Sequence, residues 1–159
     1  KQLVHTGNSG LCGYVQRNTQ CRCETIIVDT YKAQVRKLKE LQSKSGLWHT
    51  VLTDPDSYEE VSGSAAIVAG ILKGIKMGIL DDSYLECAWK GVQAILKNID
   101  KDGTVLNVSG GTGMGYDADH YKNILIAPMA YGQSLTILAL VEALQLRSRV
   151  QIRTHVLYK

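Results

Sequence analysis

The segment at residues 62–77 constrains the fold most strongly, because it is apolar on nearly every side. It reads SGSAAIVAGILKGIKM, and its first charged residue is Lys73. At the 3.6-residue period of an α-helix, such a segment has no wide polar face, so other elements must cover most of its surface. Residues 131–146, which include LTILALVEALQL, have the same character. The chain is therefore predicted to build a core around two enclosed helices.

Two further segments are predicted to be amphipathic helices, at residues 29–43 and 82–99. Asp81 or Asp82 is placed to cap the start of the second one. No segment alternates apolar and polar residues over six positions, so strands should be minor. Four main helices, two enclosed and two amphipathic, predict an all-α fold in which outer helices wrap inner ones. The expected apolar stripes are Tyr31, Val35, Leu38 and Leu41, then Leu85, Ala88, Val92, Ile95 and Ile99.

Charge and composition argue against several classes of function. The net charge is +3, and Lys and Arg alternate with Asp and Glu without forming a basic stripe, so nucleic-acid binding is not expected. No run of 18 apolar residues is present, so no membrane helix is expected. The four cysteines, at positions 12, 21, 23 and 87, lack the CxxC spacing of zinc sites. We expect no metal, no cofactor, and reduced thiols in a cytoplasmic protein.

Two connections between the predicted helices, at residues 44–61 and 100–130, are too long for a plain helical bundle. Both are rich in Gly, Ser, Asp and aromatic residues. Long structured connections in compact domains usually carry function, so the site is expected there.

Three blocks of sequence carry a family resemblance. Residues 45–65 read SGLWHTVLTDPDSYEEVSGSA and are followed by ILKGIKMGILD at residues 71–81. Residues 107–124 read NVSGGTGMGYDADHYKNI, and residues 128–144 read PMAYGQSLTILALVEAL. In this order the blocks closely resemble glycoside hydrolase families 105 and 88, the unsaturated rhamnogalacturonyl and unsaturated glucuronyl hydrolases.

The resemblance implies that the chain forms part of an (α/α)6 toroid, which is a ring of six helical hairpins. Twelve helices with their connections need about 300 residues, so the four main helices expected here are a part of that ring. We predict three regions: an irregular segment at residues 1–28 that departs from the family pattern, a partial toroid at residues 29–146, and a tail at residues 147–159. The family's RGNxW-like segment has only a Gly-Asn-Ser remnant here, at residues 7–9.

The resemblance also implies a reaction. Such enzymes act on oligosaccharides from pectin breakdown that end in a 4,5-unsaturated uronic acid. An aspartic acid protonates the double bond, water adds to the neighbouring carbon, and the resulting hemiketal releases the sugar. That aspartate lies upstream of the matching blocks, so no residue here corresponds to it. The isolated chain is therefore predicted to be an inactive part of such a hydrolase.

Several residues in the connections are candidates for binding an acidic oligosaccharide. An exposed Trp can stack on a sugar and a His can bond to its hydroxyls, although a Trp packed beneath the loop fits the pattern equally well. The polar residues at the start of the helix near position 62 can favour the anionic uronate; alternatively they only cap that helix, through Ser57 with Glu60 or through Ser62 or Ser64. The full set is Trp48, His49, Tyr58, Glu60, Ser62, Ser64 and Thr112.

Other motifs in the connections are predicted to be structural. The glycine-rich residues 110–115 lack the GK[ST] ending of a phosphate loop, so they are expected to shape a tight loop at the cavity rim. Asp117, Asp119 and His120 are expected to be solvated rather than to bind a metal. Two alternatives to the hydrolase remain open: a non-catalytic carbohydrate-binding module, and a module that self-associates through exposed apolar helices.

Overall fold

The computed structural model describes the backbone of residues 10–157 and the side chains of residues 22–147. The chain divides into two units, residues 1–34 and residues 35–159, and each is described by itself. The Gly-Asn-Ser remnant at residues 7–9 lies outside the described residues.

In the first unit, the described residues all belong to helix α1, which spans Gly10–Glu40 and ends in the second unit. The expectation of an irregular segment at residues 1–28 is therefore wrong from Gly10 onward. Nearly all side chains from Arg22 to Thr30 are exposed, so this part of the helix needs no apolar stripe. Hydrophobic periodicity indicates a packed face, so it gives little signal where most described side chains of a helix are exposed.

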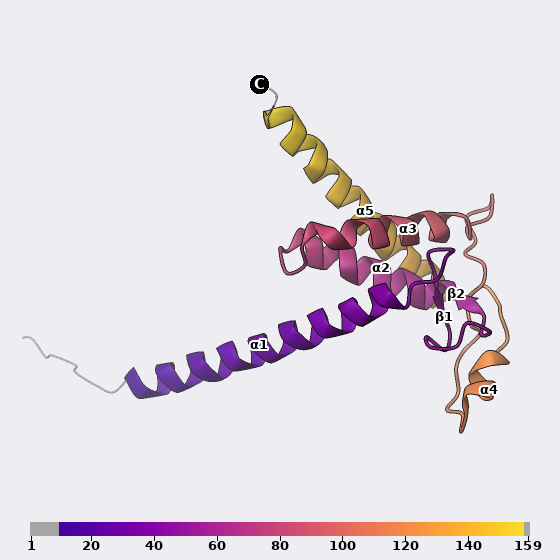
Figure 1. Cartoon of the computed structure of the whole chain (residues 1–159), viewed down its shortest axis with the longest axis horizontal. Helices are drawn as coiled ribbons and strands as arrows, with labels where there is room; N and C mark the ends of the chain where they lie inside the picture. Colours follow the sequence, from indigo (N-terminus) through magenta and orange to yellow (C-terminus); the bar gives the residue numbers. More distant parts are fainter. Residues whose placement is uncertain (1–9, 158–159) are drawn as a thin grey trace, which may run out of the picture. The chain divides into compact units, whose positions relative to one another are not determined.

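The second unit is built around helix α2 (Val61–Lys76), which packs against both α3 (Leu85–Leu96) and α5 (Ala130–Leu157). Figure 1 shows these three helices beside one another. A 3-10 turn, η1 (Asp82–Tyr84), precedes α3, and the short helix α4 (Ala118–Lys122) lies within the second long connection. The fully buried core includes Val61, Val68, Ile71 and Leu72 of α2, Ala88 and Ile95 of α3, and Ala139 of α5.

The two inner segments were predicted with different success. The expected helix at residues 62–77 corresponds closely to α2, which is enclosed as predicted. The helix expected at residues 131–146 begins correctly but continues to Leu157, through most of the expected tail. Residues 147–157 contain neither Gly nor Pro, so nothing in the sequence stops the helix there.

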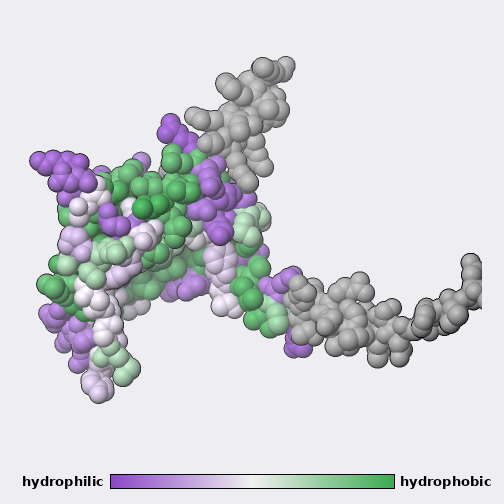
Figure 2. Space-filling view, turned by 180° about the vertical axis from the view of Figure 1, so that it is seen from behind, coloured by the Kyte–Doolittle hydropathy of each residue, from purple (hydrophilic) through white to green (hydrophobic). Residues whose placement is uncertain are grey.

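The prediction that this last helix is enclosed is wrong for the structure of this chain. Helix α5 packs on α2, and one of its faces carries the buried Ala139 and Ala143, whereas the opposite face is open: Ile137 is 60% exposed and Leu144 is 64% exposed. No described element of the second unit covers that face. Apolar side chains reach the surface over several parts of this unit (Figure 2). On α5 the open stripe consists of Ile137, Leu138, Val141 and Leu144, which we call the α5 stripe.

Strands are minor among the described residues, as predicted. Strand β1 (Trp48–His49) pairs antiparallel with β2 (Glu59–Glu60), with Trp48 opposite Glu60. The pair closes a loop directly before α2. None of the described helices is both long enough and apolar enough to cross a membrane.

Candidate functional site

A cavity of about 490 Å³ lies where the two long connections meet α2 and α5. Of the seven candidate residues, the structure brings six to its lining. The seventh, Tyr58, lies one step away, because its hydroxyl bonds at 2.8 Å to the hydroxyl of Ser109, which does line the cavity. The six lining candidates are Trp48, His49, Glu60, Ser62, Ser64 and Thr112.

Glu60 joins the two connections at the cavity wall. It is the N-cap of α2, and its carboxylate accepts from the backbone N–H groups of Ser62 at 3.1 Å and Gly63 at 2.6 Å. It also accepts from the Ser62 hydroxyl at 2.7 Å and from the backbone N–H of Ser109, 49 residues away, at 3.1 Å. With only 9% of its surface exposed, this carboxylate is a buried acceptor for four donors.

The capping residue therefore differs from those predicted. Ser57 does not form a capping box with Glu60, because its hydroxyl donates to the Asp54 carbonyl oxygen at 2.7 Å. Ser64 instead donates to the Glu60 carbonyl oxygen at 2.6 Å and accepts from the backbone N–H of Trp48 at 2.9 Å. Because Glu60 already engages the first free donors of α2, they do not form an open anion site.

Trp48 borders the cavity without offering its ring as a sugar platform. It is 2% exposed, and its indole N–H donates to the Leu38 carbonyl oxygen at 2.7 Å. Of the two alternatives for this residue, the structure supports a Trp packed beneath the loop. A Trp buried in this way presents no exposed ring face on which a sugar could stack.

His49 is half-buried beside Trp48, with Nδ1 at 2.5 Å from the Ser57 carbonyl oxygen. A carbonyl oxygen only accepts, so Nδ1 carries the hydrogen and Nε2 is left as the acceptor in the neutral ring. His49 lines the cavity and can therefore present one hydrogen-bonding nitrogen to a bound hydroxyl.

Sequence reasoning missed two aromatic residues of the cavity, Tyr121 and Tyr131. The Tyr131 hydroxyl donates to the Ser109 carbonyl oxygen and accepts from the backbone N–H of Gly111 at 3.1 Å. The Tyr121 hydroxyl accepts from the backbone N–H of Gly115 at 3.2 Å. Both tyrosines thus hold the glycine-rich loop that exposes Thr112 at the cavity rim. The sequence signal was their position in two of the family-like blocks, residues 107–124 and residues 128–144.

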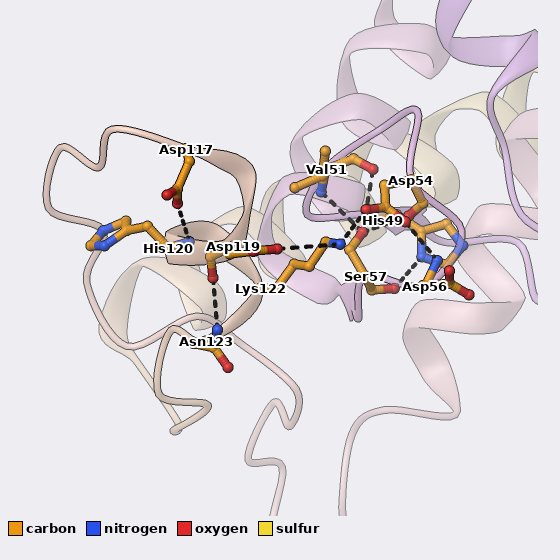
Figure 3. Close-up of polar contacts among 10 residues, drawn as sticks. All are labelled: His49, Val51, Asp54, Asp56, Ser57, Asp117, Asp119, His120, Lys122 and Asn123. Atoms are coloured by element: carbon orange, nitrogen blue, oxygen red, sulfur yellow. Dashed lines mark hydrogen bonds and ion pairs between the residues drawn. The ribbon is translucent and has the colours of Figure 1, made fainter.

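A salt bridge connects the two long connections near the cavity. The Lys122 ammonium, at the end of α4, lies 2.5 Å from the Asp54 carboxylate and 3.7 Å from that of Asp119. Figure 3 shows the Lys122 side chain directed from α4 toward the loop of Asp54. Tyr121, the neighbour of Lys122 in α4, lines the cavity, so this salt bridge joins a lining segment to the loop of Asp54. We call the Asp54–Lys122 pair the loop latch.

The loop latch should open in acid. The hydrogen bond from Lys122, followed by the one from the Asp56 backbone N–H, holds the pKa of Asp54 below its ordinary value of 3.8. The hydrogen bond to Asp54 raises the pKa of Lys122. Stabilisation by a carboxyl group with a lowered pKa is complete above the ordinary value and is lost as pH falls through the lower, folded value. We expect the latch to be closed at neutral pH and to open only as pH falls through the lowered pKa of Asp54, beneath the ordinary value of 3.8.

The measurement for the loop latch is the pH dependence of amide chemical shifts around Asp56 and Lys122, followed by NMR. The variant Asp54→Asn should abolish the acid transition at Lys122, whereas Asp102→Asn, at an exposed aspartate elsewhere in the chain, should leave it unchanged. An acid transition at Lys122 that persists in Asp54→Asn would mean that another group controls the contact.

The other polar residues near α4 have structural partners. Asp117 caps α4 by accepting from the backbone N–H of His120 at 2.9 Å, and Asp119 faces Lys122. Within the part of the chain whose side chains are described, no three His, Cys, Asp or Glu residues gather as metal ligands would.

Comparisons with known proteins agree with the resemblance found in the sequence. The family model described as Glycosyl Hydrolase Family 88 matches residues 18–147. The chain is 36% identical over 126 residues to the unsaturated rhamnogalacturonyl hydrolase YesR of Bacillus subtilis (strain 168), covering 79% of this chain and 35% of that protein. It is 31% identical over 105 residues to an unsaturated 3S-rhamnoglycuronyl hydrolase of Formosa agariphila, covering 62% of this chain and 28% of that protein.

Solved structures show the same relationship. The structure of a possible member of the GH105 family from Salmonella enterica has a TM-score of 0.74 and 40% identity, covering 78% of this chain and 32% of that one. A family 88 structure from Bacteroides vulgatus, at 20% identity and a TM-score of 0.63, covers 75% of this chain and 35% of that one and supports the fold alone. The prediction of an all-α fold that forms part of a toroid of helical hairpins is confirmed. The chain spans about a third of the length of the relatives it matches.

Proposed function

Because this chain belongs to glycosyl hydrolase family 88, we propose that it supplies part of the sugar-binding cleft of an unsaturated rhamnogalacturonyl or glucuronyl hydrolase. The substrate class is an acidic oligosaccharide ending in a 4,5-unsaturated uronic acid, which such an enzyme cleaves by hydration of the double bond. The observation that carries the proposal is the cavity itself, since separate blocks of family-like sequence converge on it. Hydroxyl groups from both connections and the rings of Tyr121 and Tyr131 suit a sugar.

We also propose that the proton donor of this reaction is not in this chain. Among the described residues that line the cavity, Glu60 is the only carboxylic acid. Its oxygens accept from four donors that organise the cavity wall. A general acid must instead carry a proton directed at the reacting atom. Glu60 is therefore suited to hold the loops in place, and a carboxylic acid outside the described cavity would have to protonate the double bond.

An assay with an unsaturated rhamnogalacturonan disaccharide tests this proposal. The purified chain is expected to bind the sugar but to leave the ultraviolet absorbance of the 4,5-double bond unchanged over hours. A full-length relative serves as the positive control. Turnover by this chain that disappears in Glu60→Gln would show that the chemistry resides here and would overturn the assignment of Glu60 as structural.

A second candidate function is a non-catalytic module that self-associates, and the α5 stripe favours it. The apolar side chains of this stripe are exposed along one helix face, as in surfaces that pair with another protein. Sedimentation velocity at increasing concentration tests it, and a monomer throughout would reject it.

The free thiols of Cys23 and Cys87 support a reducing, cytoplasmic location, which fractionation of the source cells would test.

A further inference from the structure

Helices α2 and α5 are both apolar, but their apolar surfaces are covered to different extents. Helix α2 packs against α3 and α5, and its Ile71 and Leu72 are fully buried. On α5, the side chains of Ile137, Leu138 and Val141 are exposed. Residues three and four positions apart are neighbours on a helix surface, so Val141 joins the other two into one aliphatic surface. This surface is the part of the α5 stripe on which the inference rests.

The chemistry of this surface favours an apolar helix as its partner. Residues 123–141 contain no Lys, Arg, Asp or Glu, so the surface offers no ion pair to a nucleic acid or to lipid headgroups. An aliphatic stripe along one side of a helix instead suits the side-chain ridges of a second helix. The other side of α5 already packs on such a helix, α2.

The family fold indicates which helices belong on the open side of α5. This chain forms part of a toroid of helical hairpins, and it covers only 32% of the Salmonella enterica structure and 35% of YesR. In a closed ring, each helix that lines the ring has neighbours on two sides. Helix α5 meets α2 on one side, so its open side is where a further hairpin of the ring belongs.

We propose that the α5 stripe is a docking face for helical hairpins of the family 88 type, and that this chain can take them from a separate polypeptide. The occupant is a polypeptide that carries the part of the ring that this chain does not match. This inference rests on the proposed function and extends it, because the docked hairpins also supply the carboxylic acid that protonates the double bond.

A second copy of this chain is a poorer occupant of the stripe. Two copies bring the same cavity lining twice, and in that lining Glu60 is the only carboxylic acid among the described residues. Its oxygens are already engaged by four donors. A pair of identical chains therefore leaves the proposed reaction without a proton donor, whereas the missing hairpins provide one.

The experiment co-expresses the full 159-residue chain with a tagged form of YesR from which the region similar to this chain is deleted. We expect the untagged chain to co-purify with it, and sedimentation velocity to show one copy of each in the complex. The complex should also consume the double-bond absorbance of the unsaturated rhamnogalacturonan disaccharide. Intact YesR is the control and should not retain the chain, because its own residues already occupy that position. The Salmonella enterica relative with the same deletion is a second probe.

The variant Leu138→Asp tests the stripe directly. Leu138 is 55% exposed, so the free chain tolerates a charge there, whereas a docked helix would bury it. We expect the partner to bind at least about tenfold more weakly. The matched control is Leu96→Asp, since Leu96 is 50% exposed on α3, outside the stripe, and this change should leave binding unaltered. Ile137→Asp repeats the test, and circular dichroism confirms that each variant keeps its helix content.

A one-to-one complex that Leu138→Asp and Ile137→Asp weaken, and that Leu96→Asp does not, supports the docking face. If that complex forms without turnover, the docking face stands and the proposed reaction is contradicted. Failure of both deleted relatives to form a soluble complex overturns the docking face, and sugar binding by the isolated chain then decides the proposed function separately. The docking face is also overturned by a complex that the stripe variants leave intact, or by self-association of the chain that displaces the partner.

Discussion

Replacing Trp48 with Ala is expected to lower the free energy of unfolding by about 3–5 kcal/mol, because it removes a large side chain from a closed part of the core. The side chain is 2% exposed, and its N–H donates to the Leu38 carbonyl oxygen, which holds the beginning of the first long connection against the last turns of α1. Truncation leaves both a cavity and a buried carbonyl oxygen without its donor. Since small domains are stable by only about 5–15 kcal/mol, the loss should be visible as a large shift of the unfolding midpoint.

Urea unfolding followed by far-ultraviolet circular dichroism measures this effect without relying on tryptophan fluorescence. Trp89 is a matched control, since it is the chain's second Trp and is only half-buried, so Trp89→Ala should cost clearly less. Trp48→Phe keeps most of the volume and isolates the hydrogen bond, at about 1 kcal/mol. A cost below about 1 kcal/mol for Trp48→Ala would refute the buried position.

Gly46→Ala is expected to be the second most damaging change, at about 3 kcal/mol or more. Gly46 has a φ of +105°, which L-residues rarely adopt, and a Cβ added there would lie 2.5 Å from the Lys90 carbonyl oxygen. That oxygen belongs to the backbone of α3 and cannot turn away as a side chain would. The Gln42 amide strengthens the same junction by donating to the carbonyl oxygens of Gly46 and Cys87, each at 2.9 Å.

Gly78→Ala separates backbone strain from steric overlap. Gly78 also has a positive φ, +72°, but a Cβ added there would meet nothing within 4 Å. The expected cost is therefore the strain alone, about 1 kcal/mol. Both variants are compared by urea unfolding under identical conditions. Equal costs for the two would contradict the close approach of Gly46 to α3.

The helices of the core were predictable because their apolar patterns record packing that exists in this chain. Helix α2 is the clearest example, since the apolar residues around its axis meet α3 on one side and α5 on another. The start of α1 and the continuation of α5 beyond residue 146 were not predicted, because neither segment shows a clear apolar period in the sequence. An exposed helix carries no packed face, and the open α5 stripe looks identical in sequence to an enclosed one.

The site was only partly predictable, because its decisive contacts join distant parts of the chain. The sequence identified Trp48 and Glu60 as candidates, but the direction of each side chain depends on a partner elsewhere: Leu38 for the indole and Ser109 for the carboxylate. Leu38 lies in an apolar stripe and Ser109 in a family-like block, but nothing in either pattern pairs them with Trp48 and Glu60. Local patterns can locate a functional loop, whereas three-dimensional contacts decide which of its side chains face the ligand.

The bonds of Glu60 have a consequence for the thermodynamics of ligand binding. One carboxylate fixes both the start of α2 and the backbone at Ser109, so two walls of the cavity are ordered before any sugar arrives. The conformational entropy of arranging them is then lost during folding and not again on association. A ligand that enters such a preorganised cavity needs to restrict mainly its own motion, which allows measurable affinity from few direct contacts.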